Sequence, residues 1–383
     1  MRIIPYGRQH LDDEDIRAVV EVLRSDFLTQ GPKVREFEDA LAEYVGAKFV
    51  VVFSSGTAAL HAAYYSIGLS RGDEFITTPI TFAATSNAGL YLGAVPTFVD
   101  IEADTGNMDV SRVEDKITNR TRLIVPVHYA GHPVDMEKLY DVAQKYGVSI
   151  IEDACHALGA KYKGMRVGSP VYSEMVVFSF HPVKHITTGE GGAVATNSSQ
   201  LYERLLMFRQ HGVTRQNFVN PPDGPWYYEM QELGFNYRLT DIQSALGISQ
   251  LKKLGKFVDK RKQIVKWYER LLGSNPYVDL PVEKEYADPS WHLYPVRLKD
   301  GYKEKKKRLF ERLGEDGIKL QVHYIPVYMH PYYRKLGYGV GICPIAEDFY
   351  RREMSLPIYY SLDINDVSYV VDRICDALGS WIG

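Results

Sequence analysis

Residues 175–196 read MVVFSFHPVKHITTGEGGAVAT, and they carry the strongest information about the fold. The two ends of this stretch, Met175–Phe180 and Gly192–Thr196, have the apolar, β-branched composition of buried strands and predict a strand pair. Between them, Lys184 follows the first strand and precedes a glycine-rich turn that enters the second. Because open α/β sheets bind ligands at the carboxyl ends of their strands, this position makes Lys184 a candidate site residue.

Upstream of this stretch, short apolar runs alternate with helical segments. The predicted strands are Phe49–Phe53, Glu74–Thr78, Thr97–Val99, Leu123–Val127 and Val148–Ile151. The predicted helices between them are Thr57–Gly68, Phe82–Leu92 and Val134–Tyr146. This alternation predicts an α/β fold with a largely parallel sheet that is covered on both faces.

The pattern changes after Thr240, where two consecutive helices are predicted, Asp241–Leu254 and Lys256–Leu272. Farther on, strands and helices alternate again. The predicted elements there are strands His292–Leu298 and Lys319–His323 and helices Lys303–Leu313, Ile345–Arg352 and Asn365–Leu378. We therefore expect a large domain over residues 1–255 and a smaller α+β domain over residues 256–383.

Composition excludes several classes of protein. The 383 residues are 45% hydrophobic and 24% charged, as in ordinary globular chains. The net charge of −3 argues against non-specific binding to nucleic acid. The first ten residues contain no apolar signal segment and no run of about 18 apolar residues occurs, so we expect a cytoplasmic chain without membrane contact. Cys155, Cys343 and Cys375 lie far apart, so neither a disulfide framework nor a structural zinc site is predicted.

Lys184 admits two interpretations. A lysine is ordinarily a solvated surface charge. Here it lies among apolar residues, hydroxyls and glycines, where loss of water would lower the pKa of its amine. Such an amine can attack a carbonyl carbon and form a Schiff base. The neighbouring residues alone leave both interpretations open.

Asp153 and His156 follow the strand that ends near Ile151, in the segment IIEDACHALG at residues 150–159. A buried carboxylate there needs a cationic partner, and the protonated pyridine nitrogen of pyridoxal phosphate is one. Two alternatives stay open. Asp153 could cap a helix, or Asp153 and His156 could bind a metal, for which a third nearby ligand is missing.

A third motif, FSSGTAAL at residues 53–60, joins a strand to a helix start through small residues. The free N–H groups at such a helix start bind anions such as phosphate. The motif is neither GxGxxG nor a Walker loop, so a dinucleotide or a nucleoside triphosphate is not indicated. Together with Asp153 and Lys184, it completes the set of groups that a pyridoxal phosphate enzyme needs.

Two further segments carry weaker signals. Phe82 follows a predicted strand and offers a ring above a ligand, although core packing explains a phenylalanine equally well. Before the first long helix, Thr240 or Asp241 could cap the helix, while Asn236 and Arg238 could bind an anion.

Five segments, in order, resemble the DegT/DnrJ/EryC1/StrS family of nucleotide-sugar aminotransferases. They are SSGTAAL (54–60), TTPITFAATSNAGLYLGAVPTFVDI (77–101), EDACHALGA (152–160), SFHPVKHITTGEGG (179–192) and GFNYRLTDIQSALGISQL (234–251). The resemblance implies the fold type I, or aspartate-aminotransferase-like, fold of pyridoxal 5′-phosphate (PLP) enzymes, with a large, mostly parallel-sheet domain and a smaller C-terminal α+β domain. It also implies a homodimer with shared active sites.

By this resemblance, Lys184 looks like the lysine that binds PLP covalently and Asp153 like the partner of its pyridine nitrogen, and both are implied to be catalytic. The implied cofactor-binding residues are Ser55, Gly56, Thr57, Phe82, Asp153, His156, Ser179, Lys184 and Asn236. Asn236 would come from the partner subunit, and His156 stands where the family usually has glutamine. The implied substrate-binding residues are Tyr6, Asp26, Phe27, Leu28, Thr29, Gly56, Ser179, Asn236, Gln321, Val322, His323 and Tyr324.

One branch of the family has histidine in place of the lysine and dehydrates sugars, so Lys184 favours transamination. Residues 4–7, 26–31, 224–231 and 321–327 resemble the branch that serves pseudaminic acid biosynthesis. That branch transfers an amino group from L-glutamate to C4 of UDP-2-acetamido-2,6-dideoxy-β-L-arabino-hexos-4-ulose. The alternatives are another 4-keto or 3-keto nucleotide sugar, a sugar dehydratase, a non-enzymatic sensor on this fold, and a metal hydrolase. No metal is expected.

Overall fold

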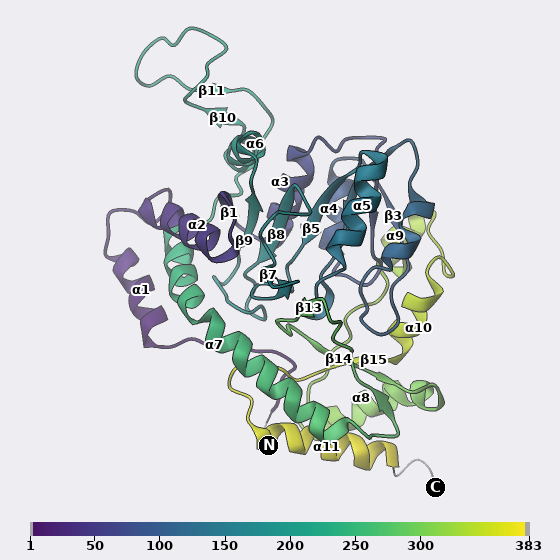
Figure 1. The fold of residues 1–383 in the computed structure, drawn as a ribbon. Helices are drawn as coiled ribbons and strands as arrows, with labels where there is room; N and C mark the ends of the chain where they lie inside the picture. The colour runs from purple at the N-terminus through teal and green to yellow at the C-terminus, as the bar shows by residue number, and fades with distance from the viewer. Residues whose placement is uncertain (1–2, 380–383) are drawn as a thin grey trace.

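A seven-stranded sheet organises the first half of the chain in the computed structural model, which describes residues 3–379 (Figure 1). Its spatial order is β1-β9-β8-β5-β4-β2-β3. These strands are β1 (Phe49–Phe53), β2 (Glu74–Thr77), β3 (Val95–Phe98), β4 (Thr121–Val125), β5 (Ser149–Asp153), β8 (Met175–Ser179) and β9 (Gly192–Thr196). Only β9 runs antiparallel to its neighbours β1 and β8. The predicted α/β fold with a largely parallel sheet is therefore confirmed, as is the predicted strand pair.

Helices cover both faces of this sheet because successive strand residues point to opposite sides. In β1, Val50 and Val52 pack into a cluster with α2 (Pro32–Val45), whereas Val51 and Phe53 pack into a cluster with α3 (Gly56–Ser66). The remaining helices of this part of the chain are α1 (Asp13–Leu23), α4 (Ala84–Tyr91), α5 (Met136–Tyr146) and α6 (Ser199–Arg209). The strands are thus buried from both sides, as their apolar runs predict.

One helix replaces the two that were predicted after Thr240: α7 runs without a break over Asp241–Leu272 (Figure 1). Gly255 lies in its interior, and a glycine costs a helix only about 1 kcal/mol relative to alanine. Burial on both sides of Gly255 outweighs that cost, since Phe257 packs in the cluster around α2 and Ile264 packs in the C-terminal core. The prediction of two helices was wrong for this reason.

The C-terminal part is built on a three-stranded sheet of order β12-β14-β15. Its elements are β12 (Val278–Asp279), β14 (Tyr294–Leu298), α8 (Lys306–Glu315), α9 (Pro331–Lys335), α10 (Pro344–Arg352), β15 (Glu353–Leu356) and α11 (Ile364–Gly379). The strand predicted at Lys319–His323 is wrong, because this segment makes only an isolated bridge between Gln321 and Ser355. The N–H of His323 donates instead to the Glu353 side chain.

The remaining short strands form two small sheets. These strands are β6 (Lys161–Tyr162), β7 (Met165–Arg166), β10 (Val213–Thr214), β11 (Glu229–Met230) and β13 (Ala287–Asp288). The β10–β11 hairpin and its loop extend away from the body of the molecule in Figure 1. Among the described residues, no helix combines the length and apolarity that crossing a membrane requires.

The two ends of the chain share one core. Ile4 is 1% exposed and packs with residues of α7, β14 and α11. Its backbone N–H donates to the carbonyl of Gly317, and its carbonyl accepts the N–H of Lys319. The predicted domain boundary at residue 255 lies inside α7, and the division into two domains stays a prediction.

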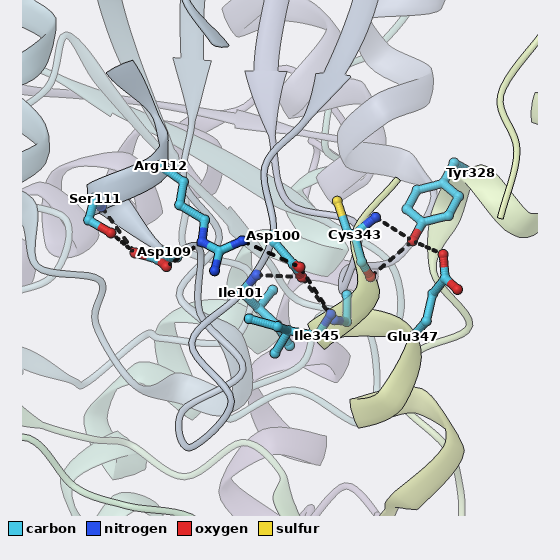
Figure 2. A network of polar contacts seen from close by, with 10 residues as sticks. Asp100, Ile101, Asp109, Ser111, Arg112, Tyr328, Cys343, Ile345 and Glu347 are labelled. Atoms are coloured by element: carbon cyan, nitrogen blue, oxygen red, sulfur yellow. Dashed lines mark hydrogen bonds and ion pairs between the residues drawn. The ribbon is translucent and has the colours of Figure 1, made fainter. Parts of the chain in front are cut away.

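Asp100 joins the large sheet to α10 (Figure 2). Its carboxylate accepts the N–H groups of Ile345 and Ala346 in the first turn of α10, at 3.0 and 2.8 Å. It also accepts the N–H of Ile101, and the Arg112 guanidinium lies 4.0 Å away. Nearby, Tyr328 donates to Glu347 of the same helix. A carboxylate from the loop after β3 thus caps a helix that lies 245 residues farther along the chain.

We expect Asp100→Ala to lower the free energy of unfolding by about 2 kcal/mol, because it leaves buried N–H groups of the α10 start without an acceptor. Urea unfolding measures the loss. The matched control is Arg112→Ala, which removes the two ion pairs of a half-exposed guanidinium, to Asp100 and Asp109, and is expected to cost at most about 0.5 kcal/mol. Equal stability of Asp100→Ala and the wild type would contradict this role for Asp100.

Candidate active site

The predicted site residues converge on one edge of the sheet. Strands β1, β8 and β5 are mutually parallel, since β1 and β8 both run antiparallel to β9 and β8 pairs parallel with β5. Their carboxyl ends therefore meet at the same edge. Asp153 ends β5, and the segments that follow β1 and β8 carry Ser55 and Lys184, so the three residues lie at this edge as the sequence predicted.

The start of α3 forms a narrow cup next to the end of β8. Ser55 caps the helix, its hydroxyl oxygen accepting the N–H of Ala58 at 3.1 Å. Gly56 lies so close to Ser179 that a Cβ atom on it would stand 2.9 Å from the Ser179 Cβ. Gly56 and Thr57 begin the helix, so their N–H groups lack intrahelical acceptors and point out of its end. The geometry therefore brings together four of the predicted cofactor-binding residues, Ser55, Gly56, Thr57 and Ser179.

Asp153 is 3% exposed at the end of β5. Its Oδ2 accepts the hydroxyl of Thr85 at 2.7 Å, and its Oδ1 accepts the N–H of Cys155 at 3.1 Å. No ion pair between described residues involves it. A turn follows Asp153 rather than a helix, so the helix-cap alternative is wrong. The carboxylate is thus buried without an ion pair to a described residue, and the nearby Lys184 amine acts on it only through space.

Lys184 is half-buried, so the surface-charge alternative does not describe its position. Burial lowers the pKa of its amine, while Cys155 and Asp153 act in the opposite direction. Its Nζ lies 3.4 Å from Nε2 of His292, which precedes β14. Burial, and next the positive charge of Lys184, hold the pKa of His292 well below its ordinary value, so this imidazole is neutral.

His156 and Phe82 form another side of the site with Tyr324. Nε2 of His156 lies 3.0 Å from the Tyr324 hydroxyl, and the two rings stack with centroids 6.0 Å apart. The Phe82 ring lies 6.4 Å from that of Tyr324 and is 63% exposed, so core packing does not explain it. Nδ1 of His156 is buried without a partner among the described residues. The metal alternative gains no support, since no group of three ligating side chains forms in the described chain.

Tyr6 and the 321–324 segment, which includes Tyr324, form the next side of the site, here called the predicted substrate wall. The rings of Tyr6 and His323 are 5.3 Å apart, and the ring of His323 lies 4.9 Å from that of Tyr324. His323 is 7% exposed, while Gln321 is exposed and Val322 is half-buried. These predicted substrate-binding residues are thus adjacent to the predicted cofactor site.

Two predicted segments lie elsewhere in this chain. Asp26, Phe27, Leu28 and Thr29 are all exposed and lie at the start of α7, where the Leu28 carbonyl accepts the N–H of Asp241. Asn236 is exposed as well and forms a bridge with Gln210. Thr240 caps α7 with Gln243 in a reciprocal capping box, as one alternative proposed. No hydrogen bond or ion pair between described residues joins these residues to Lys184 or Asp153.

Sequence reasoning missed three residues of the site. Thr85 binds Asp153, His292 binds Lys184, and Cys155 places its N–H against the Asp153 carboxylate. The spacing of Thr81 and Thr85 on one face of a helix start was an available signal, since their hydroxyls lie 2.8 Å apart. His292 lies at the start of a predicted strand and belongs to none of the sequence motifs described above, so no sequence signal indicated its role.

The site fits the predicted cofactor in three respects. The start of α3 with Gly56 and Ser179 forms a cup for phosphate. The buried Asp153 carboxylate requires a cation such as a pyridinium. The Lys184 amine lies near both Cys155 and Asp153, and its pKa is lowered, as covalent binding to an aldehyde requires.

Comparison with known proteins agrees with this fit. The model of the DegT/DnrJ/EryC1/StrS aminotransferase family matches residues 9–375. The chain is 41% identical over 374 residues to an uncharacterized protein of Methanocaldococcus jannaschii, covering 97% of this chain and 96% of that one. It is 41% identical over 379 residues to the UDP-4-amino-4,6-dideoxy-N-acetyl-β-L-altrosamine transaminase of Campylobacter jejuni, covering 98% of each.

Solved structures show the same fold. Helicobacter pylori PseC, an aminotransferase involved in the biosynthesis of pseudoaminic acid, matches with a TM-score of 0.93 and 39% identity, over 99% of this chain and 100% of PseC. The PLP form of Spr1654 from Streptococcus pneumoniae matches with a TM-score of 0.92 and 30% identity, over 99% of each chain. These matches confirm the predicted fold type and the cofactor, pyridoxal 5′-phosphate.

Proposed function

The chain belongs to the DegT/DnrJ/EryC1/StrS aminotransferase family, and we propose that it aminates C4 of UDP-2-acetamido-2,6-dideoxy-β-L-arabino-hexos-4-ulose with L-glutamate as the donor. The product would be UDP-4-amino-4,6-dideoxy-N-acetyl-β-L-altrosamine, an intermediate of pseudaminic acid biosynthesis. The observation that carries this choice is the full-length similarity to a relative named for that product. The general activity, PLP-dependent transamination of a nucleotide sugar, follows from the family.

A second candidate is transamination of another keto nucleotide sugar. A relative named UDP-4-amino-4-deoxy-L-arabinose–oxoglutarate aminotransferase, from Shewanella sediminis, is 34% identical over 98% of both chains. Such epimers and nucleotides differ by few groups, and a pocket discriminates them through individual hydrogen bonds. The substrate therefore has to be identified by direct competition.

When bound, PLP carries the amino group between the two substrates and disperses the negative charge that forms at the reacting carbon. Burial lowers the pKa of the Lys184 amine, which favours its unprotonated form, and the amine would move the proton at Cα of glutamate and later at C4 of the sugar. Asp153 would accept a hydrogen bond from the protonated nitrogen of the pyridine ring. Thr85 orients that carboxylate through its 2.7 Å hydrogen bond.

We expect Lys184→Ala to lower turnover by about 10²–10⁴-fold or more, because the general base is lost. Asp153→Asn should still bind PLP but lose most turnover, because the amide cannot balance a pyridinium charge. Steady-state rates and the visible absorbance of bound PLP measure the two effects. Lys138→Ala is the control, since this lysine is largely exposed and pairs with Asp135. Full activity of Lys184→Ala would overturn the assignment.

The substrate is tested with glutamate and a panel of UDP- and dTDP-linked 4-keto and 3-keto sugars. We expect kcat/KM for the UDP-linked arabino-configured 4-ketosugar to exceed that for each other sugar by at least about tenfold. Product analysis by mass spectrometry and NMR identifies the aminated carbon and its configuration. Preference for a dTDP-linked or 3-keto sugar would replace the proposed substrate with the second candidate.

We also propose that the enzyme is a cytoplasmic homodimer with shared active sites. The three cysteines are free, which suits a reducing compartment. The β10–β11 arm extends from the body, and its loop exposes Trp226 at 71% and Tyr228 at 58% (Figure 1). Exposed aromatic side chains on an ordered arm are typical of a protein interface.

The arm is ordered by one carboxylate. Glu229 accepts hydrogen bonds from the N–H groups of Val219 and Asn220, from the Tyr227 hydroxyl and from the Gln231 amide. These hydrogen bonds lower the pKa of Glu229 to about 2, and the one from Gln231 has the largest effect. The loop therefore holds its shape without support from the body of the same subunit, as an arm that reaches a partner must.

Sedimentation is expected to give about twice the 43.6 kDa mass of one chain at micromolar concentration. Trp226→Glu should shift the molecule toward the monomer, because a charge on the arm would be buried in the interface. Tyr369→Glu, an exposed aromatic position on α11, is the control and should leave the dimer unchanged. A wild-type monomer would contradict the proposal.

A further inference from the structure

Behind the predicted substrate wall, two hydrogen bonds connect a buried carboxylate to an active-site imidazole. Oε1 of Glu353 accepts the hydroxyl of Ser355 at 2.6 Å, and the Ser355 Oγ lies 2.8 Å from Nδ1 of His323. The second carboxylate oxygen, Oε2, accepts the backbone N–H of His323 at 2.9 Å. Glu353 and Ser355 are both fully buried in β15.

Glu353, Ser355 and His323 form a relay, a chain of two side-chain hydrogen bonds, and the donor and acceptor properties of each group determine where its protons lie. An ionised carboxylate only accepts hydrogen bonds, so the Ser355 hydroxyl must donate its single proton to Glu353. The Ser355 oxygen then acts as an acceptor toward His323, which must carry its proton on Nδ1. Nε2 of His323 is left with a free lone pair, and it makes no hydrogen bond with any described residue.

His323 lies at the site rather than merely beneath it. Its ring contacts those of Tyr6 and Tyr324, which both belong to the predicted substrate wall. Burial, and next the charge of Lys184, lower the pKa of His323 to about 3, so the ring is neutral at working pH. For a neutral imidazole, the choice of tautomer decides whether Nε2 accepts or donates a hydrogen bond.

We propose that Glu353 is a positioning residue that acts through Ser355 to hold His323 in the Nδ1–H tautomer, so that Nε2 accepts a hydrogen bond from a hydroxyl or amide N–H of the keto sugar. The role of His323 toward the sugar rests on the proposed function. The role of Glu353 toward His323 rests on the relay alone.

Protonation of Glu353 reverses the relay. A neutral carboxyl donates from Oε1 to Ser355, the Ser355 hydroxyl then donates to Nδ1, and the His323 proton moves to Nε2. Burial raises the pKa of Glu353 to about 7, with Ser355, Lys306 and the His323 N–H opposing the rise. The titratable or charged groups that face Glu353 from the packed elements are Lys306, Arg297, Tyr129, His323 and Tyr324.

Glu353→Gln imposes the reversed state at every pH with almost no change in shape. The amide oxygen must occupy the Oε2 position, because it has to accept the His323 N–H. The amide NH₂ then donates to Ser355, which in turn must donate to Nδ1 of His323. Ser355→Ala removes the relay and leaves the tautomer without this control.

The test is ¹⁵N NMR of histidine-labelled holoenzyme without substrate, with the His323 signals identified by their absence from His323→Gln. At about pH 8.5 we expect the wild type to carry the proton on Nδ1, and at about pH 5.5 on Nε2. Glu353→Gln should carry it on Nε2 at both values. The control Glu174→Gln changes a different carboxyl, which is partly buried and accepts the Ile150 N–H, and should behave as the wild type.

A wild-type tautomer that is the same at both pH values, or an Nδ1–H signal in Glu353→Gln, would overturn the proposal.

Steady-state kinetics then test the consequence for substrate binding. Glu353→Gln should raise KM for the keto sugar about tenfold, which corresponds to the loss of one hydrogen bond between His323 and the sugar. It should leave KM for glutamate unchanged. An equal change in both KM values would overturn the link to the sugar. Failure of the proposed function differs from either outcome, because the wild type would then not turn over the UDP sugar.

Discussion

The buried carboxylate of Asp153 is the constraint on which the active site depends. It lies at the end of a central strand and receives hydrogen bonds from one hydroxyl and one N–H, but it makes no ion pair with a described residue. A carboxylate that has lost its water is stable only beside a cation. The site is therefore complete only when a cationic ring enters it, and Thr85 and Cys155 fix the orientation of the carboxylate through one hydrogen bond to each oxygen.

The same edge of the sheet supplies a phosphate cup and an amine whose pKa is lowered by burial, and each comes from a different strand end. Their separation along the chain is large, but the parallel strands bring them to one place. This is why three local motifs, each weak by itself, predicted one cofactor. It is also why the strand order β1-β9-β8-β5 matters more to the chemistry than the helices around it.

The sequence predicted the sheet well because most of its strands contain a run of apolar residues, and it predicted Lys184 and Asp153 at one edge because both lie at or after the carboxyl end of such a run. It failed where a local signal was outweighed by packing: Gly255 suggested a helix break, yet Phe257 and Ile264 hold α7 in two cores at once. It also failed where a side chain replaces a strand partner, since Glu353 takes the N–H of His323. The contact of His292 with Lys184 and the relay through Ser355 each join residues that are distant in the sequence. No sequence motif with a fixed spacing contains these pairs, so the sequence could not predict them.

Ile4 packs in the core that α11 completes, and it pairs with residues 317–319. During synthesis at about 5–20 residues per second, these partners emerge roughly 15 to 60 seconds after Ile4 itself. The first strands of the large sheet can pair in that interval, whereas the segment that carries Tyr6 has no native partner until nearly the whole chain has been made. The substrate wall is thus the part of the active site whose contacts are the last to become available, after the strand ends that receive the cofactor have been synthesised.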